Sequence, residues 1–249
     1  MRPYSLSVAR RVSLTMIGAI AIIALFGVSS KAGAEMTSAQ ILEKCRQTYR
    51  TMKSYSGTTN VITKRGVRGS ETVYNTSATV EFVRPGKIRV DGTTMAPSKF
   101  CIVSDGQNTW QTSIVNPAKW DRGRSPAISI AAFNGVSQQA SSVVPALLLD
   151  ARSGNPFSTP VSNGVKREPL NGSQVYRIES SLQMGHVTFW IDVKTFRIVK
   201  LVQHSEVSKS GKGAAHLPPL VIDVTVTFTG EHLNSDIAGT TFAKPAGAP

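Results

Sequence analysis

Four histidines are the side chains of this sequence that are best suited to bind a metal or to transfer a proton. None of His186, His204, His216 and His232 has a cysteine or carboxylate partner at the spacing of a metal site or a catalytic pair. Two of the four lie near expected loops. We therefore interpret all four as surface or core histidines and expect no metal site.

The carboxylates and hydroxyls also form no motif of a common catalytic class. The chain has no Gly-x-Ser-x-Gly elbow, no Cys–His nucleophile pattern and no glycine-rich phosphate loop. Asp192 ends an expected strand and is predicted to cap the turn at Val193-Lys194-Thr195. These observations predict a protein that is not an enzyme and uses no cofactor, and they favour an apolar container over a reactive site.

Cys45 and Cys101 are the two cysteines of the chain. Cys45 lies on the apolar face of an expected helix, and Cys101 lies in an expected strand. An exported protein permits a disulfide that joins the two. Two separately buried thiols fit the same pattern, so both alternatives stay open.

Residues 1–34 have the three parts of a secretory signal peptide. A start that is rich in arginine precedes an apolar run from Leu14 to Val28, and Ala32-Gly33-Ala34 then supplies a small-x-small cleavage site. The apolar run is about 15 residues long, shorter than the roughly 20 residues that span a bilayer. We expect cleavage before Glu35 and a periplasmic domain formed by residues 35–249.

The charge balance is basic, with 28 Lys and Arg against 15 Asp and Glu and a formal net charge of +13. Such a balance suits anionic lipid surfaces or acidic partners. The charges are spread along the chain, and export removes nucleic acid from the expected partners. We expect a monomer that makes transient contact with a membrane surface; a merely solvated basic surface is the alternative.

The elements that must position these residues begin with one amphipathic helix, capped by Thr37 or Ser38. Period-two alternation follows from Ser54 onward and predicts an antiparallel meander. Turn residues at Arg84-Pro85-Gly86, Asp105-Gly106 and Asn171-Gly172 separate the strands. The apolar positions of the helix are Ile41, Leu42, Cys45, Tyr49 and Met52. The expected strands lie near 55–64, 72–83, 87–91, 99–104, 108–115, 173–181, 186–193, 196–205 and 219–230.

A helical insertion at about 118–150 interrupts the strands. A short helix is expected after Pro126, and a second apolar stretch over 143–149 has Ser137 as a candidate cap. That second stretch is apolar nearly all round, so something must cover it. Residues 208–217 are expected to form a mobile loop.

Together these elements predict a mainly β fold with helices (α+β). We expect a strongly curved antiparallel sheet that forms an unclosed β-barrel. The N-terminal helix and a helical lid would cover its concave face.

Four motifs then occur in a recognisable order after the leader. They are Phe82-Val83-Arg84-Pro85, Val103-Ser104-Asp105-Gly106 followed by Trp110, Pro145-Ala146-Leu147-Leu148-Leu149, and Phe242-Ala243-Lys244-Pro245. In this order the chain resembles the LolA/LolB superfamily of outer-membrane lipoprotein carriers over most of residues 37–245. The resemblance is weakest at 118–140 and 205–218, and Lys99, Cys101 and the basic loop at 209–212 depart from the family pattern.

The resemblance implies a hydrophobic cavity that binds acyl chains without chemistry. Arg84 matches an inward arginine whose hydrogen bonds to the lid control opening; the alternative is a strand-end arginine that caps a turn. Ile88 falls where carriers place a cavity-lining aromatic, and Trp110 would pack under the lid or in an ordinary core. Leu147 and Leu148 would belong to the lid.

Two functions follow from the resemblance as expectations. The first is a periplasmic carrier or binder of a lipid or of lipoprotein acyl chains. The second is a protein-interaction or sensor module of the envelope that uses the same fold. Bound amphiphile favours the first, and a stoichiometric protein partner without lipid favours the second. A fold transfers between proteins more readily than a ligand does.

Overall fold

The computed structural model describes residues 36–96, 98–151, 157, 162–182, 184–207 and 218–249. The expected signal peptide with its cleavage site, and the expected loop at 208–217, lie outside the described residues. The description below therefore concerns the domain that begins at Met36.

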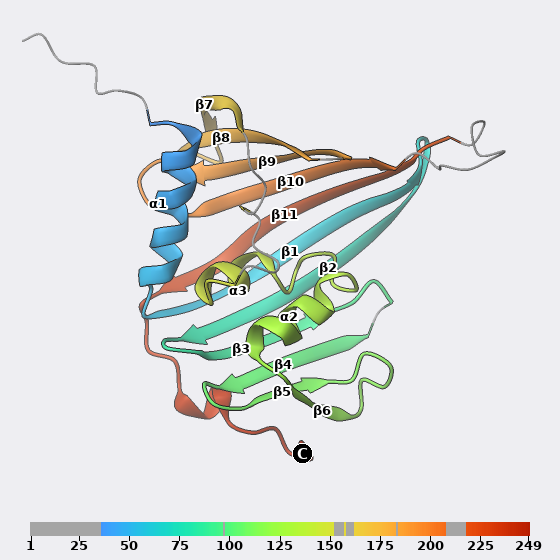
Figure 1. Cartoon of the computed structure of the whole chain (residues 1–249), viewed down its shortest axis with the longest axis vertical. Coiled ribbons are helices and arrows are strands. Elements are labelled where there is room, and N and C mark those ends of the chain that lie inside the picture. The colour runs from blue at the N-terminus through green and yellow to red at the C-terminus, as the bar shows by residue number, and fades with distance from the viewer. Residues whose placement is uncertain (1–35, 97, 152–156, 158–161, 183, 208–217) are drawn as a thin grey trace, which may run out of the picture. The chain divides into compact units, whose positions relative to one another are not determined.

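One antiparallel sheet of eleven strands dominates the described residues, in the order β6-β5-β4-β3-β2-β1-β11-β10-β9-β8-β7 (Figure 1). Apart from β6 and β7, strands that follow one another in the chain pair with each other, and β1 pairs with β11 to join the two halves. Within the described residues, β6 and β7 end this order unpaired with each other, so the sheet is unclosed. The strands are β1 (Ser54–Val67), β2 (Ser70–Val83), β3 (Lys87–Thr93), β4 (Lys99–Asp105), β5 (Thr109–Thr112), β6 (Trp120–Gly123), β7 (Ser162–Leu170), β8 (Ser173–Leu182), β9 (Gly185–Asp192), β10 (Ile198–Val207) and β11 (Leu220–Leu233).

The first helix, α1 (Ser38–Thr51), forms where the amphipathic pattern predicts it. Thr37 is its N-cap, and the reciprocal hydrogen bonds between Thr37 and Gln40 form a capping box. The buried face of α1 consists of Ile41, Cys45 and Tyr49. The hydroxyl of Tyr49 accepts a hydrogen bond from the backbone N–H of Ile198, which ties the helix to the start of β10.

Two further helices follow β6. Ser125 caps α2 (Pro126–Asn134), and Pro126 occupies the first helical position, where its missing N–H costs nothing. All six residues of α3 (Val143–Leu148) are buried. The predicted cap Ser137 is wrong for α3: residue 142 precedes the helix, and the hydroxyl of Ser137 lies 2.9 Å from that of Ser141.

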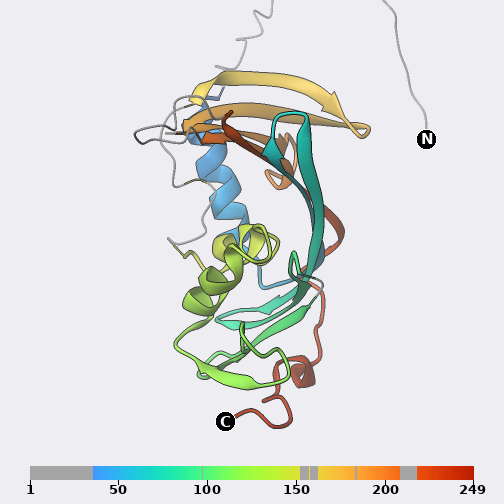
Figure 2. The same cartoon turned by 90° about the vertical axis from the view of Figure 1, so that its right-hand side faces the viewer.

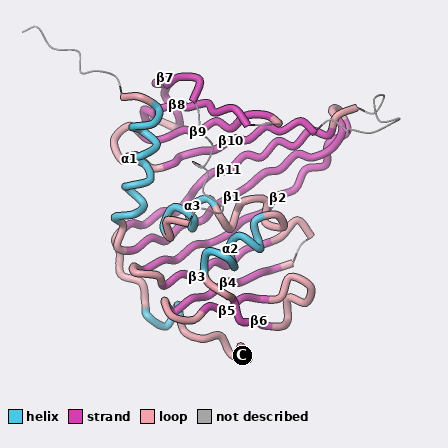
Figure 3. The backbone as a smooth tube through the Cα atoms, in the orientation of Figure 1, coloured by secondary structure: helices cyan, strands magenta, loops and turns pink. Residues whose placement is uncertain are grey.

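The three helices lie on the inner side of the curved sheet, as Figures 2 and 3 show. One hydrophobic core fills the space between them and the strands, and it includes buried residues of α1, α2 and α3 and of both halves of the sheet. The expected α+β architecture, with helices on the concave face of an unclosed sheet, is confirmed.

Two strands were not expected from the sequence. The segment that forms β6 lies inside the expected helical insertion. With only four residues, all paired with β5, this strand is too short to show a recognisable alternation. The segment of β7 contains Gly164 and Pro169, which are typical of turns. As an end strand of the sheet, β7 tolerates a proline because one of its edges has no strand partner.

The Val-Ser-Asp-Gly motif forms the tight turn between β4 and β5. The carboxylate of Asp105 accepts hydrogen bonds from the backbone N–H groups of Gln107 and Asn108 at 2.8 and 2.7 Å. Gly106 has a φ of +95°, which a residue with a side chain rarely adopts. The motif is therefore explained by turn geometry.

Candidate functional site

Arg84, at the end of β2, joins the two helices that close the concave face. Its Nε donates to the carbonyl of Met52 at 3.0 Å, and Nη2 donates to the carbonyls of Tyr49 and Leu148, each at 3.2 Å. The first two carbonyls belong to the C-terminal end of α1, and the third belongs to the last residue of α3. We call Arg84 with these three carbonyls the latch.

The charge of Arg84 suits this position. The last carbonyls of a helix have no partner within the helix and carry partial negative charge, so a cation is favourable there. Two helix ends converge on one guanidinium, which has enough donors to serve both. A second link between the same elements is the exposed ion pair of Arg50 and Asp150 at 2.7 Å.

Next to the latch, the helix α3, which we call the lid, consists entirely of apolar residues. Leu147 and Leu148 of α3 are fully buried in the main core, and so is Ile88 of β3. The start of the lid is tied to the sheet, because Thr76 donates to the carbonyl of Ser137 at 2.8 Å. The segment from Ser137 to the end of α3 is thus held by the Thr76 hydrogen bond at its beginning and by the latch at its end.

Two buried threonine hydroxyls of β1 lack a hydrogen-bond partner in the part of the chain that the structure describes. Thr59 and Thr63 of β1 are buried, and within the described residues their Oγ1 atoms have no partner. Each lies two positions from Val61, a core residue, so all three side chains point to the same face of the sheet. Buried polar atoms are normally hydrogen-bonded, so these two could accept a polar guest atom in the interior.

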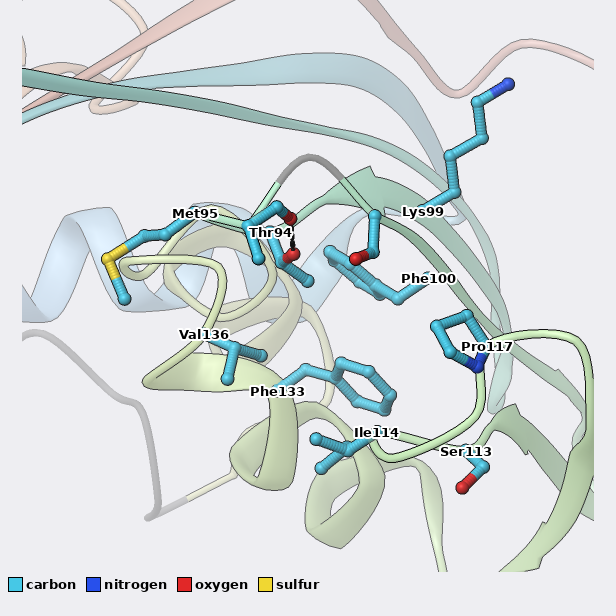
Figure 4. A pocket seen from close by; sticks show the side chains of 11 residues that line it. Thr94, Met95, Lys99, Phe100, Ser113, Ile114, Pro117, Phe133 and Val136 are labelled. Atoms are coloured by element: carbon cyan, nitrogen blue, oxygen red, sulfur yellow. Dashed lines mark hydrogen bonds between the residues drawn. The ribbon is translucent and has the colours of Figure 1, made fainter.

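An open pocket of about 210 Å³ lies beside α2 (Figure 4). Phe100 of β4 and Phe133 of α2 stack in its wall with ring centroids 4.8 Å apart. Both rings also belong to the main core, so the pocket opens directly onto it. Residues 94–96 and 98, with Ser113, Ile114 and Pro117, complete the rim.

Trp110 lies elsewhere. It pairs with Val103 and packs with Cys101, Val103 and Ala248 in a second cluster, separate from the core under the helices. Its indole N–H donates to the carbonyl of Pro249 at 3.1 Å. Trp110 therefore does not lie under the lid. The register of its strand turns the side chain to the opposite face of the sheet, where it packs in this second cluster.

Of the two alternatives for the cysteines, the structure has the free thiols. Cys45 is in the main core and Cys101 in the second cluster, so the sheet separates them. Burial raises the pKa of both thiols. Both side chains are therefore protonated at neutral pH and act as small apolar residues.

The predicted turn at Asp192 is confirmed. Its carboxylate accepts hydrogen bonds from the backbone N–H of Lys194 at 3.0 Å and of Thr195 at 2.7 Å. A carboxylate partner for a histidine was not expected. His204 lies 2.6 Å from Asp223, its register partner across β10 and β11, and its ring stacks on that of His186.

Residues missed from the sequence are those of the pocket, chiefly Phe100, Phe133 and Ile114. The first two are 33 positions apart in the printed chain, and no local pattern brings them together. Among the described residues, no group of three or more His, Cys, Asp or Glu could hold a metal ion. No helix in the described part of the chain is long and apolar enough to cross a bilayer.

Comparison with known proteins gives structural matches alone; no protein-family model and no curated protein matches the chain. A LolA superfamily protein from Nitrosomonas europaea matches with 14% identity and a TM-score of 0.33, over 84% of this chain and 99% of that one. An outer membrane lipoprotein-sorting domain from Vibrio parahaemolyticus matches with 11% identity and a TM-score of 0.36, over 81% and 94%. Pseudomonas aeruginosa MucB, in complex with MucA, matches with 12% identity and a TM-score of 0.41, over 84% of this chain and 61% of that one.

At these identities and TM-scores, the matches do not identify a ligand or partner of this chain. The fold rests on the strand order of this chain and on the helices that cover its sheet. That curved, unclosed sheet with three helices on its concave face is the architecture expected from the sequence.

Proposed function

We propose that this chain is an exported, periplasmic binding protein that holds a lipid, or the acyl chains of a lipoprotein, between the concave face and the helical lid. It performs no chemistry on its cargo. The latch carries the proposal. One arginine side chain holds the end of an apolar lid over an apolar core.

The energetics suit an acyl guest. Each CH₂ group that leaves water contributes about 0.8 kcal/mol, so an acyl chain needs only apolar surface to bind. In the latched state the core side chains fill the space under α3. A guest must therefore displace the contacts of Leu147 and Leu148, and the latch sets the cost of lifting them.

The pocket beside α2 is the proposed entrance. Its wall residues Phe100 and Phe133 are members of the core, so an acyl chain in the pocket already touches the interior. The unpartnered hydroxyls of Thr59 and Thr63 give polar atoms of the guest a place to hydrogen-bond deeper inside. Entrance, lid and interior together form one continuous route for an amphiphile.

Native mass spectrometry with lipid extraction tests this function on the mature protein purified from its own envelope. The expected result is a bound amphiphile, released on denaturation and exchanged for a fluorescent fatty acid. A protein that purifies empty and also fails to bind the fatty acid contradicts the proposal. A stoichiometric protein partner without lipid would instead favour an interaction module.

A further inference from the structure

The loop between β5 and β6 presents a large aliphatic side chain to solvent. Val115 is 94% exposed, and its neighbour Ile114 is 48% exposed. Ile114 also lines the pocket (Figure 4). An aliphatic side chain held in water gains free energy wherever it finds an apolar environment.

The loop is held in shape by its own hydrogen bonds. Ser113 N–H donates to the carbonyl of Lys119 at 2.8 Å, and Lys119 N–H donates to the carbonyl of Asn116 at 2.9 Å. Asn116 Oδ1 accepts from the N–H of Ala118 at 3.2 Å. The backbone that carries Val115 is therefore held in shape before any partner arrives, which lowers the entropic cost of the contact.

Positive charge surrounds the same rim. Lys119 closes the loop, and Lys99 lies on the neighbouring strand start; both are exposed. Figure 4 shows the Lys99 side chain directed away from the pocket. The two segments 94–99 and 113–119 contain these two lysines and no acidic residue. Asp91 lies close by, since it lines a neighbouring pocket together with Lys99 and Pro117. The rim thus combines exposed aliphatic groups with two exposed lysines.

We propose that this rim docks on the surface of an anionic lipid bilayer. Val115 and Ile114 would enter the boundary between headgroups and acyl chains, and Lys99 and Lys119 would contact lipid phosphates. The docked rim turns the pocket toward the membrane. The docking would bring the pocket to the membrane that supplies the proposed cargo. In this respect it rests on the proposed function, but binding to the membrane does not itself require cargo.

Co-sedimentation with vesicles tests the docking. The mature protein should bind vesicles that mix phosphatidylcholine with phosphatidylglycerol more tightly than vesicles of phosphatidylcholine alone, and salt should weaken the binding. Val115→Asn should lower the partition coefficient about tenfold, and Lys119→Gln should lower it about fivefold. Val73→Asn is the matched control, because Val73 is a valine of β2 that is 53% exposed and lies outside both loops. It should change nothing.

Two results would overturn the docking: no preference for anionic vesicles, or equal partition of wild type and Val115→Asn. Binding of a fluorescent fatty acid in the absence of vesicles measures the cargo site separately from docking. The Val115→Asn variant should bind the fatty acid as wild type does. Vesicle binding without any fatty-acid uptake would contradict the carrier function and leave the docking intact. Thermal melts of both valine variants exclude misfolding as a cause.

Discussion

Under α1 and α3 the concave face of the sheet is filled with side chains, whereas beside α2 the same core opens into a pocket of about 210 Å³. Leu147 and Leu148 are fully buried in the closed region, and Ile114 at the open region is about half exposed. One continuous apolar core therefore has a filled part and an accessible part.

The difference between the two regions lies in how their covers are held. At α3 the latch adds charged hydrogen bonds to apolar contact. At α2 the stacked rings of Phe100 and Phe133 are packed in place beside the opening. The same core is therefore bordered by an open pocket beside α2 and closed by hydrogen-bonded helix ends at α3.

The largest effect should separate the two regions by stability. Leu147→Ala removes buried methyl groups from the closed region and should lower the free energy of unfolding by about 2–5 kcal/mol. Ile114→Ala at the pocket rim should change it by less than about 0.5 kcal/mol. Chemical denaturation of both variants measures this. Equal losses would show that the pocket rim is packed as tightly as the lid.

The latch should have an intermediate effect. Arg84→Leu removes three hydrogen bonds from helix-end carbonyls, and because the arginine is exposed we expect a loss of about 1–2 kcal/mol. Hydrogen exchange should rise over 143–151 and stay unchanged in β1. Arg46→Gln is the control, since it breaks only the ion pair with Glu43 within α1, worth about 0.2–1 kcal/mol, and does not touch α3. Unchanged exchange at α3 in the Arg84 variant would rule out the latch.

The unpartnered hydroxyls should give an effect of opposite sign. Thr63→Val removes a buried polar atom without a partner and should raise the free energy of unfolding by up to about 1 kcal/mol. The same variant should weaken fatty-acid binding if this hydroxyl receives a polar group of the guest. A destabilised Thr63→Val protein would show that the hydroxyl is already satisfied.

The smallest effect is a pH dependence at the closed region. Burial raises the pKa of Glu231, against the lowering influence of Arg197, whose Nη1 donates to it at 2.9 Å. A carboxyl whose folded pKa is raised contributes stability below its unfolded pKa and loses that contribution as pH rises through the folded value. Glu231→Gln should flatten the stability profile in this acidic window. A profile identical to wild type would contradict the raised pKa.

Asp105 in the other half of the sheet should behave in the opposite way. The N–H of Asn108 lowers the pKa of this carboxyl, so its contribution is present above the unfolded pKa and disappears as pH falls through the folded value. Asp105→Asn should therefore reduce stability at neutral pH and have little effect in acid. Denaturation at several pH values distinguishes the two carboxylates.

Local features of this fold could be predicted from the sequence. The capping box of α1, the turn at Asp192 and the alternation of the central strands depend on residues a few positions apart. A hydrogen bond from Arg84 to the lid was implied by the family resemblance alone, and its hydrogen bonds to the end of α1 were not expected. Nothing in the spacing of Arg84, Tyr49 and Leu148 shows that two helix ends meet there.

Features that depend on sheet register could not be predicted. The pairing of His204 with Asp223 requires the alignment of β10 with β11. The face occupied by Trp110 depends on the turn between β4 and β5, because a shift of one residue reverses every side chain. The pocket depends on the path of α2 over β4, which places Phe133 on Phe100.

The rate at which a fluorescent fatty acid enters the protein tests the latched lid most directly. Stopped-flow mixing of the probe with wild type and with Arg84→Leu gives this rate, and Arg46→Gln, which breaks an ion pair within α1 alone, is the control. If the latch restrains α3 by about 1–2 kcal/mol, the Arg84 variant should take up the probe about five- to thirtyfold faster than wild type. Equal rates in wild type and Arg84→Leu, or no uptake by either, would contradict a lid that opens for cargo.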